Sequence, residues 1–365
     1  GGTGAAEGTA AAGASGAVSA SSSSATGTGT NTSASCKFTF AEIFAGIGGF
    51  RLGLEPAGGR CVFAAEINED ARYTYSTNFG SEGLVSDVTE HYASRIPAHD
   101  MLTAGFPCQS FSVRGEQKGL NDPRGQLYRE LLRILKVQQP ASFLFENVAR
   151  LVTIDGGKWN SRSEGVDKCK IGATFAMMLG EFAACGYEVT WRVLNSRHWV
   201  PQNRERVYIA GFRRDVLRGQ EVGELMRWEE VQARGRGLGS TVGDILQSES
   251  EYTAPAKYRD PGNGHCVSFT PIVSLTPAQW ARINTPEFNR KASRNPSGCP
   301  EGEEKFIDIG SKAPTITSGY HNVQSFSTKF INKEKDGTVR DLPRFLSVRE
   351  CSRIMGFPDW FEIPL

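Results

Sequence analysis

The chain has 365 residues, with 41 basic and 40 acidic side chains, so its formal net charge is only +1. This balance excludes a histone-like protein that holds nucleic acid through bulk positive charge. The eight cysteines form no C-x-x-C pair, and no apolar run approaches the roughly 18 residues of a membrane helix, so we expect an intracellular protein with no zinc cluster, no other metal site and no membrane contact.

The first 35 residues differ from the rest of the chain. All but Glu7, Val18 and Asn31 are Gly, Ala, Ser or Thr, and such a segment buries too little apolar surface to offset the entropy of ordering. We therefore predict a disordered tail over residues 1–36.

Short apolar segments alternate with amphipathic ones over residues 37–214. The predicted strands are Phe38–Phe44, Cys61–Ile67, Met101–Phe106, Ser142–Val148, Glu188–Leu194 and Val207–Phe212, and the predicted helices are Phe50–Leu54, Glu69–Asn78, Gln126–Gln138 and Ala173–Cys185. Several of the strands are nearly continuous apolar runs. This pattern predicts an α/β fold with a mostly parallel, doubly wound sheet, Rossmann-like, whose ligands bind in the loops after the strands.

The pattern ends near Arg214. Residues 215–343 are rich in Gly, Pro, Ser and Asn and predict a second, smaller irregular lobe, with short strands near 266–269 and 315–318. Residues 344–355 then predict a helix approached through Pro343, with 344–365 returning to the first domain.

A glycine-rich segment follows the first predicted strand. Phe44-Ala45-Gly46-Ile47-Gly48-Gly49 is suited to a tight turn with close backbone approach to a ligand, although ordinary turns share this composition. Glu66 ends the next strand, and Asp87 follows a third short strand. At such positions a carboxylate either accepts bonds from a ribose or an adenine or is simply solvated.

A cysteine follows the strand at 101–106. Cys108 lies after Pro107 in Gly105-Phe106-Pro107-Cys108-Gln109-Ser110-Phe111-Ser112, a place where a cysteine acts as a nucleophile or as a small core residue. The polar loop 113–124 that follows is a candidate for closing over a substrate.

Two further segments place charges at strand ends. Glu146, in Phe145-Glu146-Asn147-Val148, is either a structural acceptor or a proton donor with a raised pKa. Arg204 and Arg206 alternate at the start of a strand and are expected to share one face of the sheet, where they bind a phosphate or carboxylate or form a salt bridge.

Taken together, these segments resemble the cytosine-5 DNA methyltransferases, which use S-adenosylmethionine. The matching motifs are F-A-G-I-G-G-F at 44–50, G-F-P-C-Q-S-F-S at 105–112, E-N-V at 146–148, Q-N-R-E-R at 202–206, A-P-T-I-T-S-G at 313–319 and R-F-L-S-V-R-E-C-S-R-I-M-G-F-P at 344–358. The resemblance covers about 320 residues, from Phe38 to Pro358.

The resemblance implies methyl transfer from S-adenosylmethionine to carbon 5 of a cytosine flipped out of double-stranded DNA. The Cys108 thiolate would add to carbon 6, and Glu146 would contact nitrogen 3 and the exocyclic amine. Arg204 would hold the carbonyl at position 2, with Arg206 in support. The loop 107–124, with Gln109, Ser110 and Arg114, would close behind the flipped base.

The same resemblance assigns a cofactor site. It places S-adenosylmethionine over the glycine-rich loop, with its ribose on Glu66 and its adenine near Asp87. The residues assigned to this site are Phe44, Gly46, Ile47, Gly48, Gly49, Glu66, Ile67, Asp87, Val88, Pro107 and Leu127.

The resemblance makes residues 215–343 the target-recognition lobe, with Asn289, Arg290, Lys291 and Arg294 as candidate phosphate contacts. One departure stands out: the family ends in a G-N-S-V-like motif and a final helix, neither of which is present. We interpret this as a truncated sequence in preference to the alternative, a naturally shortened enzyme. The tail leans towards a eukaryotic nuclear protein, whereas a bacterial enzyme of this kind would act in the cytoplasm.

Two alternatives remain open. One is the tRNA branch of the family, although its Cys-Phe-Thr segment is not found and the interval between 206 and 344 is long. The other is an inactive relative that binds DNA but not the cofactor. DNA target, maintenance or de novo preference, oligomeric state and protein partners are not indicated by the sequence.

Overall fold

The computed structural model describes residues 36–107, 127–158, 170–235, 239–252, 274–285, 305–316, 320, 322 and 328–364, and the backbone of 256–259 and 266–269. The predicted tail, except for Cys36, lies outside these ranges.

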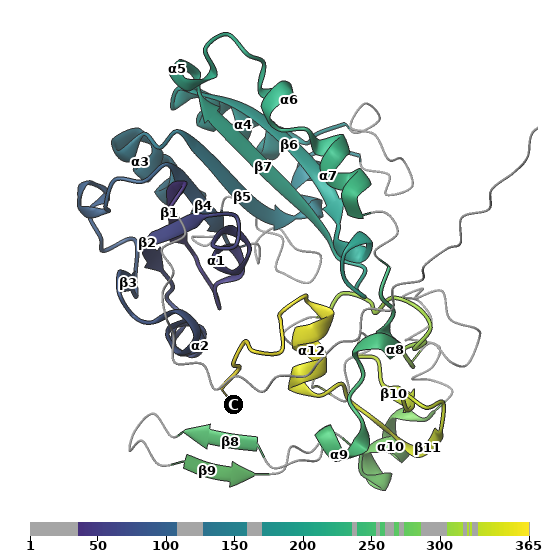
Figure 1. The fold of residues 1–365 in the computed structure, drawn as a ribbon. Coiled ribbons are helices and arrows are strands. Elements are labelled where there is room, and N and C mark those ends of the chain that lie inside the picture. The colour runs from purple at the N-terminus through teal and green to yellow at the C-terminus, as the bar shows by residue number, and fades with distance from the viewer. Residues whose placement is uncertain are drawn as a thin grey trace, which may run out of the picture. The chain divides into compact units, whose positions relative to one another are not determined.

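A seven-stranded sheet organises the first part of the chain (Figure 1). Its strands are β1 (Phe38–Ile43), β2 (Gly59–Ala65), β3 (Leu84–Val85), β4 (Met101–Gly105), β5 (Ser142–Val148), β6 (Tyr187–Asn195) and β7 (Glu205–Arg213). Their order is β3-β2-β1-β4-β5-β7-β6. The first five strands pair in parallel, and β7 runs antiparallel to both β5 and β6. The predicted mostly parallel α/β sheet is confirmed.

The helices around the sheet agree with the predicted ones to within two residues at each end. They are α1 (Gly49–Leu54), α2 (Glu69–Phe79), α3 (Tyr128–Gln138) and α4 (Ala173–Ala184), followed by α5 (Arg214–Leu217), α6 (Val222–Leu225) and α7 (Trp228–Gly235). The start of α2 is capped by Asn68, whose side chain accepts a bond from the Ala71 amide at 2.8 Å.

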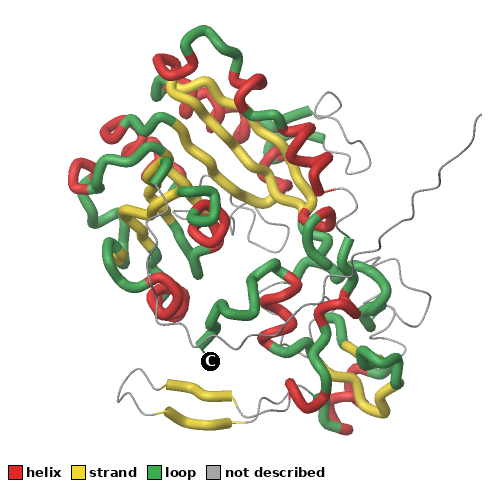
Figure 2. The backbone as a smooth tube through the Cα atoms, viewed as in Figure 1, coloured by secondary structure: helices red, strands yellow, loops and turns green. Residues whose placement is uncertain are grey.

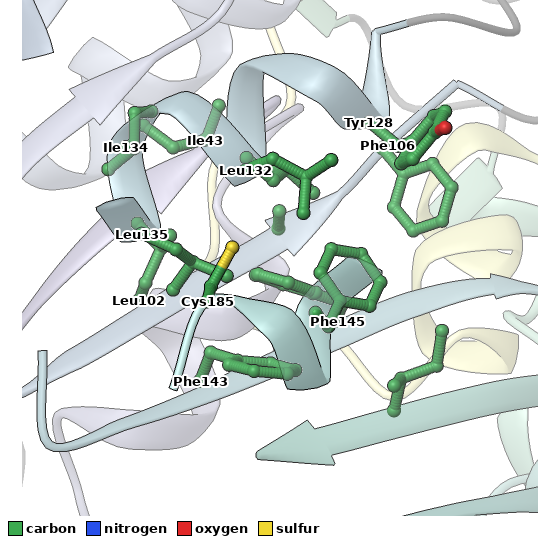
Figure 3. Close-up of a cluster of buried hydrophobic side chains, with 14 of the residues drawn as sticks. Ile43, Leu102, Phe106, Tyr128, Leu132, Ile134, Leu135, Phe143, Phe145 and Cys185 are labelled. Carbon is green, nitrogen blue, oxygen red and sulfur yellow. The ribbon is translucent and has the colours of Figure 1, made fainter. Parts of the chain in front are cut away.

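The main hydrophobic core lies between the sheet and helices α3 and α4. Figure 3 shows α3 side chains such as Leu132 and Leu135 meeting Phe143 and Phe145 of β5. Phe143 and Phe145 stack with ring centroids 4.4 Å apart, and Phe182 of α4 packs against both. Alternate residues of each strand point to this core, as expected for a sheet covered on both faces.

The other face of the sheet is covered at two separate places. Tyr75 of α2 packs on Ala45 and Ala64, and Trp228 of α7 packs on Leu194 and Ala210 of β6 and β7. The sheet between these two helices is left open at the carboxyl ends of β1, β4 and β5, where ligands bind in doubly wound folds.

A second core is formed by residues 242–354, where loops predominate around α8 and α10 (Figure 2). Its elements are α8 (Val242–Ile245), α9 (Glu249–Tyr252), α10 (Pro277–Ile283), α12 (Val348–Ile354) and the hairpins β8 (Ala256–Arg259) with β9 (Cys266–Phe269) and β10 (Ile331–Lys333) with β11 (Val339–Arg344). Phe345, Leu346 and Ile354 belong to this core.

The predicted elements of this region are only partly correct. The strand near 266–269 is confirmed as β9, but 315–316 are not in a strand; the pairing there is a single bridge between Ala313 and Gln202. The helix predicted from Arg344 begins only at Val348. Pro343 and Arg344 belong to β11, and the N-cap is Ser347, whose side chain accepts from the Glu350 amide in a capping box.

Candidate active site

Four polar side chains share the open face of the sheet at the end of β5 and the start of β7. Glu146 pairs in register with Tyr208, and Val148 pairs with Arg206, so Glu146, Tyr208 and Arg206 point to the same side. Arg204 lies just before β7, and its backbone amide donates to Asn195 Oδ1 at 3.1 Å. The prediction that Arg204 and Arg206 share one side agrees with their common place in the pocket described next.

A pocket of about 900 Å³ joins these residues to the glycine-rich loop. Its lining includes Phe44, Ala45, Gly46 and Gly49 from the loop, Gly105 from β4, Glu146 from β5, Arg204, Arg206 and Tyr208 from the β7 region, and Met355, Gly356 and Phe357 after α12. The volume suits a small-molecule site. Segments far apart in sequence therefore converge on one chamber, as the motifs predicted.

An ion pair holds the Glu146 carboxylate. Arg206 Nε lies 2.7 Å from Glu146 Oε1. Burial raises the pKa of Glu146 above its usual value, although the positive charges of Arg206 and Arg204 oppose this rise. A carboxyl group with a raised pKa keeps its proton at a higher pH than usual, so it can donate to a ring nitrogen.

The glycine-rich loop has an unusual backbone. Phe44, Gly46 and Gly48 all have positive φ values of 56°, 56° and 91°. Gly48 is required, since a Cβ there would lie 2.3 Å from Phe79 of α2. At Gly46 a Cβ would meet nothing within 4 Å, so this side of the loop is open to a ligand.

Glu66 fixes the loop from the end of β2. Its Oε2 accepts from the Gly46 amide at 2.7 Å, and its Oε1 accepts from the Asn68 amide at 2.8 Å. A carboxylate has about four acceptor positions, so two remain for hydroxyl groups. These two free acceptor positions fit the ribose-binding role that the resemblance gives to Glu66.

The remaining residues assigned to the cofactor lie around this loop but do not line the pocket. Asp87 Oδ1 accepts from both the amide and the hydroxyl of Thr89, which leaves Oδ2 for another donor. Ile67 is 69% exposed, as a residue that covers a ligand ring would be. Val88 differs: its side chain is buried in the main core, so only its backbone is available to a ligand.

The predicted nucleophile and its loop lie outside the described residues. These are Cys108, Gln109, Ser110 and Arg114, and the same holds for the basic cluster at 289–294. Pro107 and Leu127 flank the first of these gaps, and Leu127 precedes α3 as its N-cap.

The segment that leads to Cys108 is nevertheless fixed from β5. Asn147 is buried on the core side of the sheet, and its side-chain amide donates to the Phe106 carbonyl at 3.0 Å. The asparagine of the E-N-V motif therefore anchors the end of β4, two residues before the cysteine. Sequence reasoning had assigned it no role.

Other pocket residues were also missed by the motifs. Tyr208, Trp199 and Trp228 line the chamber, and only strand register and long-range packing reveal them. Gln202 lines it as well, fully buried, with neither side-chain heteroatom hydrogen-bonded. Its place in the Q-x-R-x-R motif was a signal, although it gave no indication of burial.

Glu42 is buried beneath the glycine-rich loop, in β1. Burial raises its pKa to about 8, while the backbone N–H groups of Phe50 and Arg51 act in the opposite direction. Tyr75 donates to its Oε2 at 3.4 Å.

This carboxyl group makes stability depend on pH. Because its pKa is raised in the folded state, its contribution is complete below the unfolded value of 4.5 and is lost as pH rises towards 8. The Glu42→Gln variant stays neutral, so it should gain about 1.4 kcal/mol of unfolding free energy relative to wild type per pH unit in this window. Urea unfolding between pH 5 and 9 measures the difference. The exposed Glu82→Gln serves as control, and parallel pH curves for wild type and Glu42→Gln would contradict the prediction.

The described residues also bear on two other kinds of site. No helix among them is long and apolar enough to cross a membrane. Within the same ranges, no three His, Cys, Asp or Glu side chains gather as a metal-binding group.

The sequence relatives match most of the chain. It is 33% identical over 336 residues to the type II methyltransferase M.DsaV of Dactylococcopsis salina, covering 90% of this chain and 79% of that protein. It is 34% identical over 336 residues to M.NlaX of Neisseria lactamica, covering 90% and 88%.

Solved structures share the fold. Schizosaccharomyces pombe Dnmt2 methyltransferase superposes with a TM-score of 0.56 and 20% identity over 89% of each chain. A putative DNA modification methyltransferase encoded within an Escherichia coli prophage gives 0.52 and 20%, over 89% of this chain and 90% of that one. The model of the C-5 cytosine-specific DNA methylases matches residues 38–365. The chain belongs to this family and is a DNA cytosine methyltransferase.

Proposed function

We propose that this enzyme transfers a methyl group from S-adenosylmethionine to carbon 5 of a cytosine flipped out of double-stranded DNA, through a covalent adduct with Cys108. The observation that carries the proposal is the single chamber lined by both the Gly46 loop and the Glu146–Arg206 pair. A methyl donor and a pyrimidine held at these two ends of one pocket are brought together.

The cofactor residues fit S-adenosylmethionine, which supplies an electrophilic methyl group when bound. Glu66 would hold its ribose through its remaining acceptor positions, and the free Oδ2 of Asp87 would accept from its adenine amine. The open side of Gly46 allows the close backbone approach that such a ligand needs.

The remaining residues act on the cytosine. The Cys108 thiolate adds to carbon 6, and Glu146 donates to nitrogen 3, so that carbon 5 becomes enamine-like and attacks the methyl group. Arg204 holds the carbonyl at position 2, while Arg206 fixes the Glu146 carboxyl. Removal of the carbon-5 proton and β-elimination then release Cys108.

The domain assignment follows the same proposal. Residues 37–214 carry catalysis and cofactor binding, with 344–365 returning towards them, and residues 215–343 read the DNA target. The contacts at the end of the chain support the return: the Asn78 side chain of α2 donates to the Glu362 carbonyl at 2.7 Å and accepts from its amide at 2.8 Å. As for compartment, the two sequence relatives described above come from bacteria, so they favour the cytoplasmic alternative and give the nuclear one no support.

The test is covalent trapping on duplex DNA that contains 5-fluorocytosine. Fluorine at carbon 5 is not eliminated as a proton is, so an active enzyme stalls as an adduct. We expect an adduct that requires S-adenosylmethionine and disappears in Cys108→Ser. An adduct that persists in the variant would contradict the nucleophile assignment. Parallel assays of methyl transfer to tRNA, and of cofactor binding alone, test the two alternatives: the tRNA branch predicts methylation of tRNA only, and an inactive relative predicts no bound cofactor.

A further inference from the structure

Two cations from distant parts of the chain, Arg197 and Lys312, are held beside residues 201–203, of which Gln202 lines the pocket. Residues 201–203 pair with Ala313 through two backbone bonds of 2.8 Å, from Asn203 N to Ala313 O and from Ala313 N to Pro201 O. Lys312 is therefore held beside this segment, and its Nζ donates to the Ser240 carbonyl at 2.5 Å.

Arg197 is fixed next to the same segment from the other side. The side-chain oxygen of Asn195 accepts from the amides of both Arg197, at 3.0 Å, and Arg204, at 3.1 Å. Ser196 donates through its hydroxyl to the Gln202 carbonyl at 3.0 Å. These bonds connect the turn that carries Arg197 to the residues just before β7, which include Arg204.

The two positive charges are not balanced by ion pairs. Within the described ranges, neither Arg197 nor Lys312 lies within salt-bridge distance of a carboxylate. Burial and the nearby Arg197 both lower the pKa of Lys312, which indicates that the two cations repel each other. Two acids offset these charges in part, without direct ion pairs: Asp244, bonded to Thr241, raises the pKa of Lys312, and Arg197 opposes the effect of burial on the pKa of Glu205.

The position of Arg197 and Lys312 near the pocket indicates which anion they would bind. Ser196, Trp199 and Gln202 line the pocket, and Arg197, which is exposed, lies within this run of residues at the edge. A nucleotide that enters the pocket brings its own phosphates to this rim. A phosphate oxygen placed between the two cations would remove their repulsion and form charge-assisted bonds with both.

We propose that Arg197 and Lys312 bind one backbone phosphate of the DNA strand that carries the target cytosine. The proposal rests on the proposed function, because it takes DNA as the polyanion at this pocket. One phosphate would then contact both the β6–β7 turn and the segment 312–313. This contact would set the position of the DNA strand relative to Glu146 and Arg204.

The test compares Arg197→Gln, Lys312→Gln and the double variant with wild type. The affinity for a fluorescent duplex is measured between 50 and 300 mM salt. Loss of one neutralised phosphate lowers the slope of log K against log salt concentration by about 0.9, and we expect this in the double variant. The KM for DNA should rise several-fold while kcat stays within about twofold, since neither residue touches the reacting atoms.

Neutral phosphates then locate the contact. After bisulfite sequencing has mapped the target, single methylphosphonates are placed at each phosphate near the cytosine. At one position the substitution should weaken binding by wild type and have no further effect on the double variant. Lys136→Gln is the matched control, because Lys136 is exposed on α3, which covers the opposite face of the sheet.

The proposal would be overturned if the folded double variant had the same salt slope and the same KM for DNA as wild type. It would also be overturned if each methylphosphonate weakened binding by the double variant as much as binding by wild type. Failure of the proposed function has a different signature. In that case wild type does not methylate DNA, while the salt slopes still show whether the cation pair contacts phosphate.

Discussion

Replacing Glu146 with glutamine should lower kcat for methyl transfer by about 10²- to 10⁴-fold, the usual range for loss of a general acid. Glutamine has nearly the same shape and keeps a donor for nitrogen 3, but it carries no transferable proton. Arg206 Nε lies 2.7 Å from the Glu146 carboxylate and can donate to the amide oxygen of a glutamine as well. The variant should therefore fold normally and lose chiefly the chemical step. Single-turnover methyl transfer to DNA measures the effect separately from product release.

The pH profile gives a second view of the same residue. If the protonated carboxyl is the active form, wild-type activity falls as pH rises through the raised pKa of Glu146, and this alkaline limb is absent from the glutamine variant. The control is Glu205→Gln, because burial also raises the pKa of Glu205 but the residue does not line the pocket. A loss of less than tenfold in Glu146→Gln would contradict the assigned role.

Replacing Glu350 with alanine should reduce the free energy of unfolding by about 3 kcal/mol, because it removes the nearer of the two carboxylate partners of the buried Arg344, which keeps Glu334 at 3.3 Å. Arg344 and Glu350 are both fully buried. Arg344 donates to the two Glu350 oxygens at 2.8 and 3.0 Å. The same carboxylate also accepts from the backbone amides of Ser347 and Gln247, each at 2.8 Å.

Urea unfolding of Glu350→Ala, of Asp359→Ala and of a double variant tests this expectation. Asp359→Ala removes the partner of Arg353 in an exposed ion pair of 2.7 Å, and such pairs contribute about 0–1 kcal/mol. The double variant Arg344→Met with Glu350→Leu removes both buried charges and should regain part of the loss. Equal, small losses in Glu350→Ala and Asp359→Ala would show that the buried pair stabilises the fold no more than a surface pair does.

The sheet and its helices were largely predictable because their signals are local. The apolar run at 142–148 became β5 with the same bounds, and the periodic helix at 173–185 became α4 with one residue fewer. Strand ends carry the motif residues in this fold, so the convergence of Gly46, Glu146 and Arg206 on one pocket followed from the order of strands.

The second lobe was harder to predict because long-range contacts determine it. Pro343 suggested the entry to a helix, yet it lies inside β11. Among the strands that the structure describes, β11 pairs with β10 alone, so it tolerates a missing amide donor. The sequence signal for the true start is the capping-box pattern Ser347-Val348-Arg349-Glu350. Tyr208 and Trp199 entered the site through register and tertiary packing, which no local pattern encodes.

The pairing of 201–203 with Ala313 also bears on how recognition regions can be exchanged between relatives. This short parallel contact joins the proposed target-recognition lobe directly to the run that carries Arg204 and Arg206. A chimera that exchanges only residues between Val231 and Lys312 retains the whole contact and leaves the described residues that line the pocket, Trp228 among them, unaltered. A crossover inside 313–316 would replace one side of the contact, including Thr315, whose hydroxyl donates to the Asn203 carbonyl at 2.6 Å. Under the proposed domain assignment, a new DNA target is therefore acquired with least disruption when the exchanged segment begins after Val231 and ends just before Lys312.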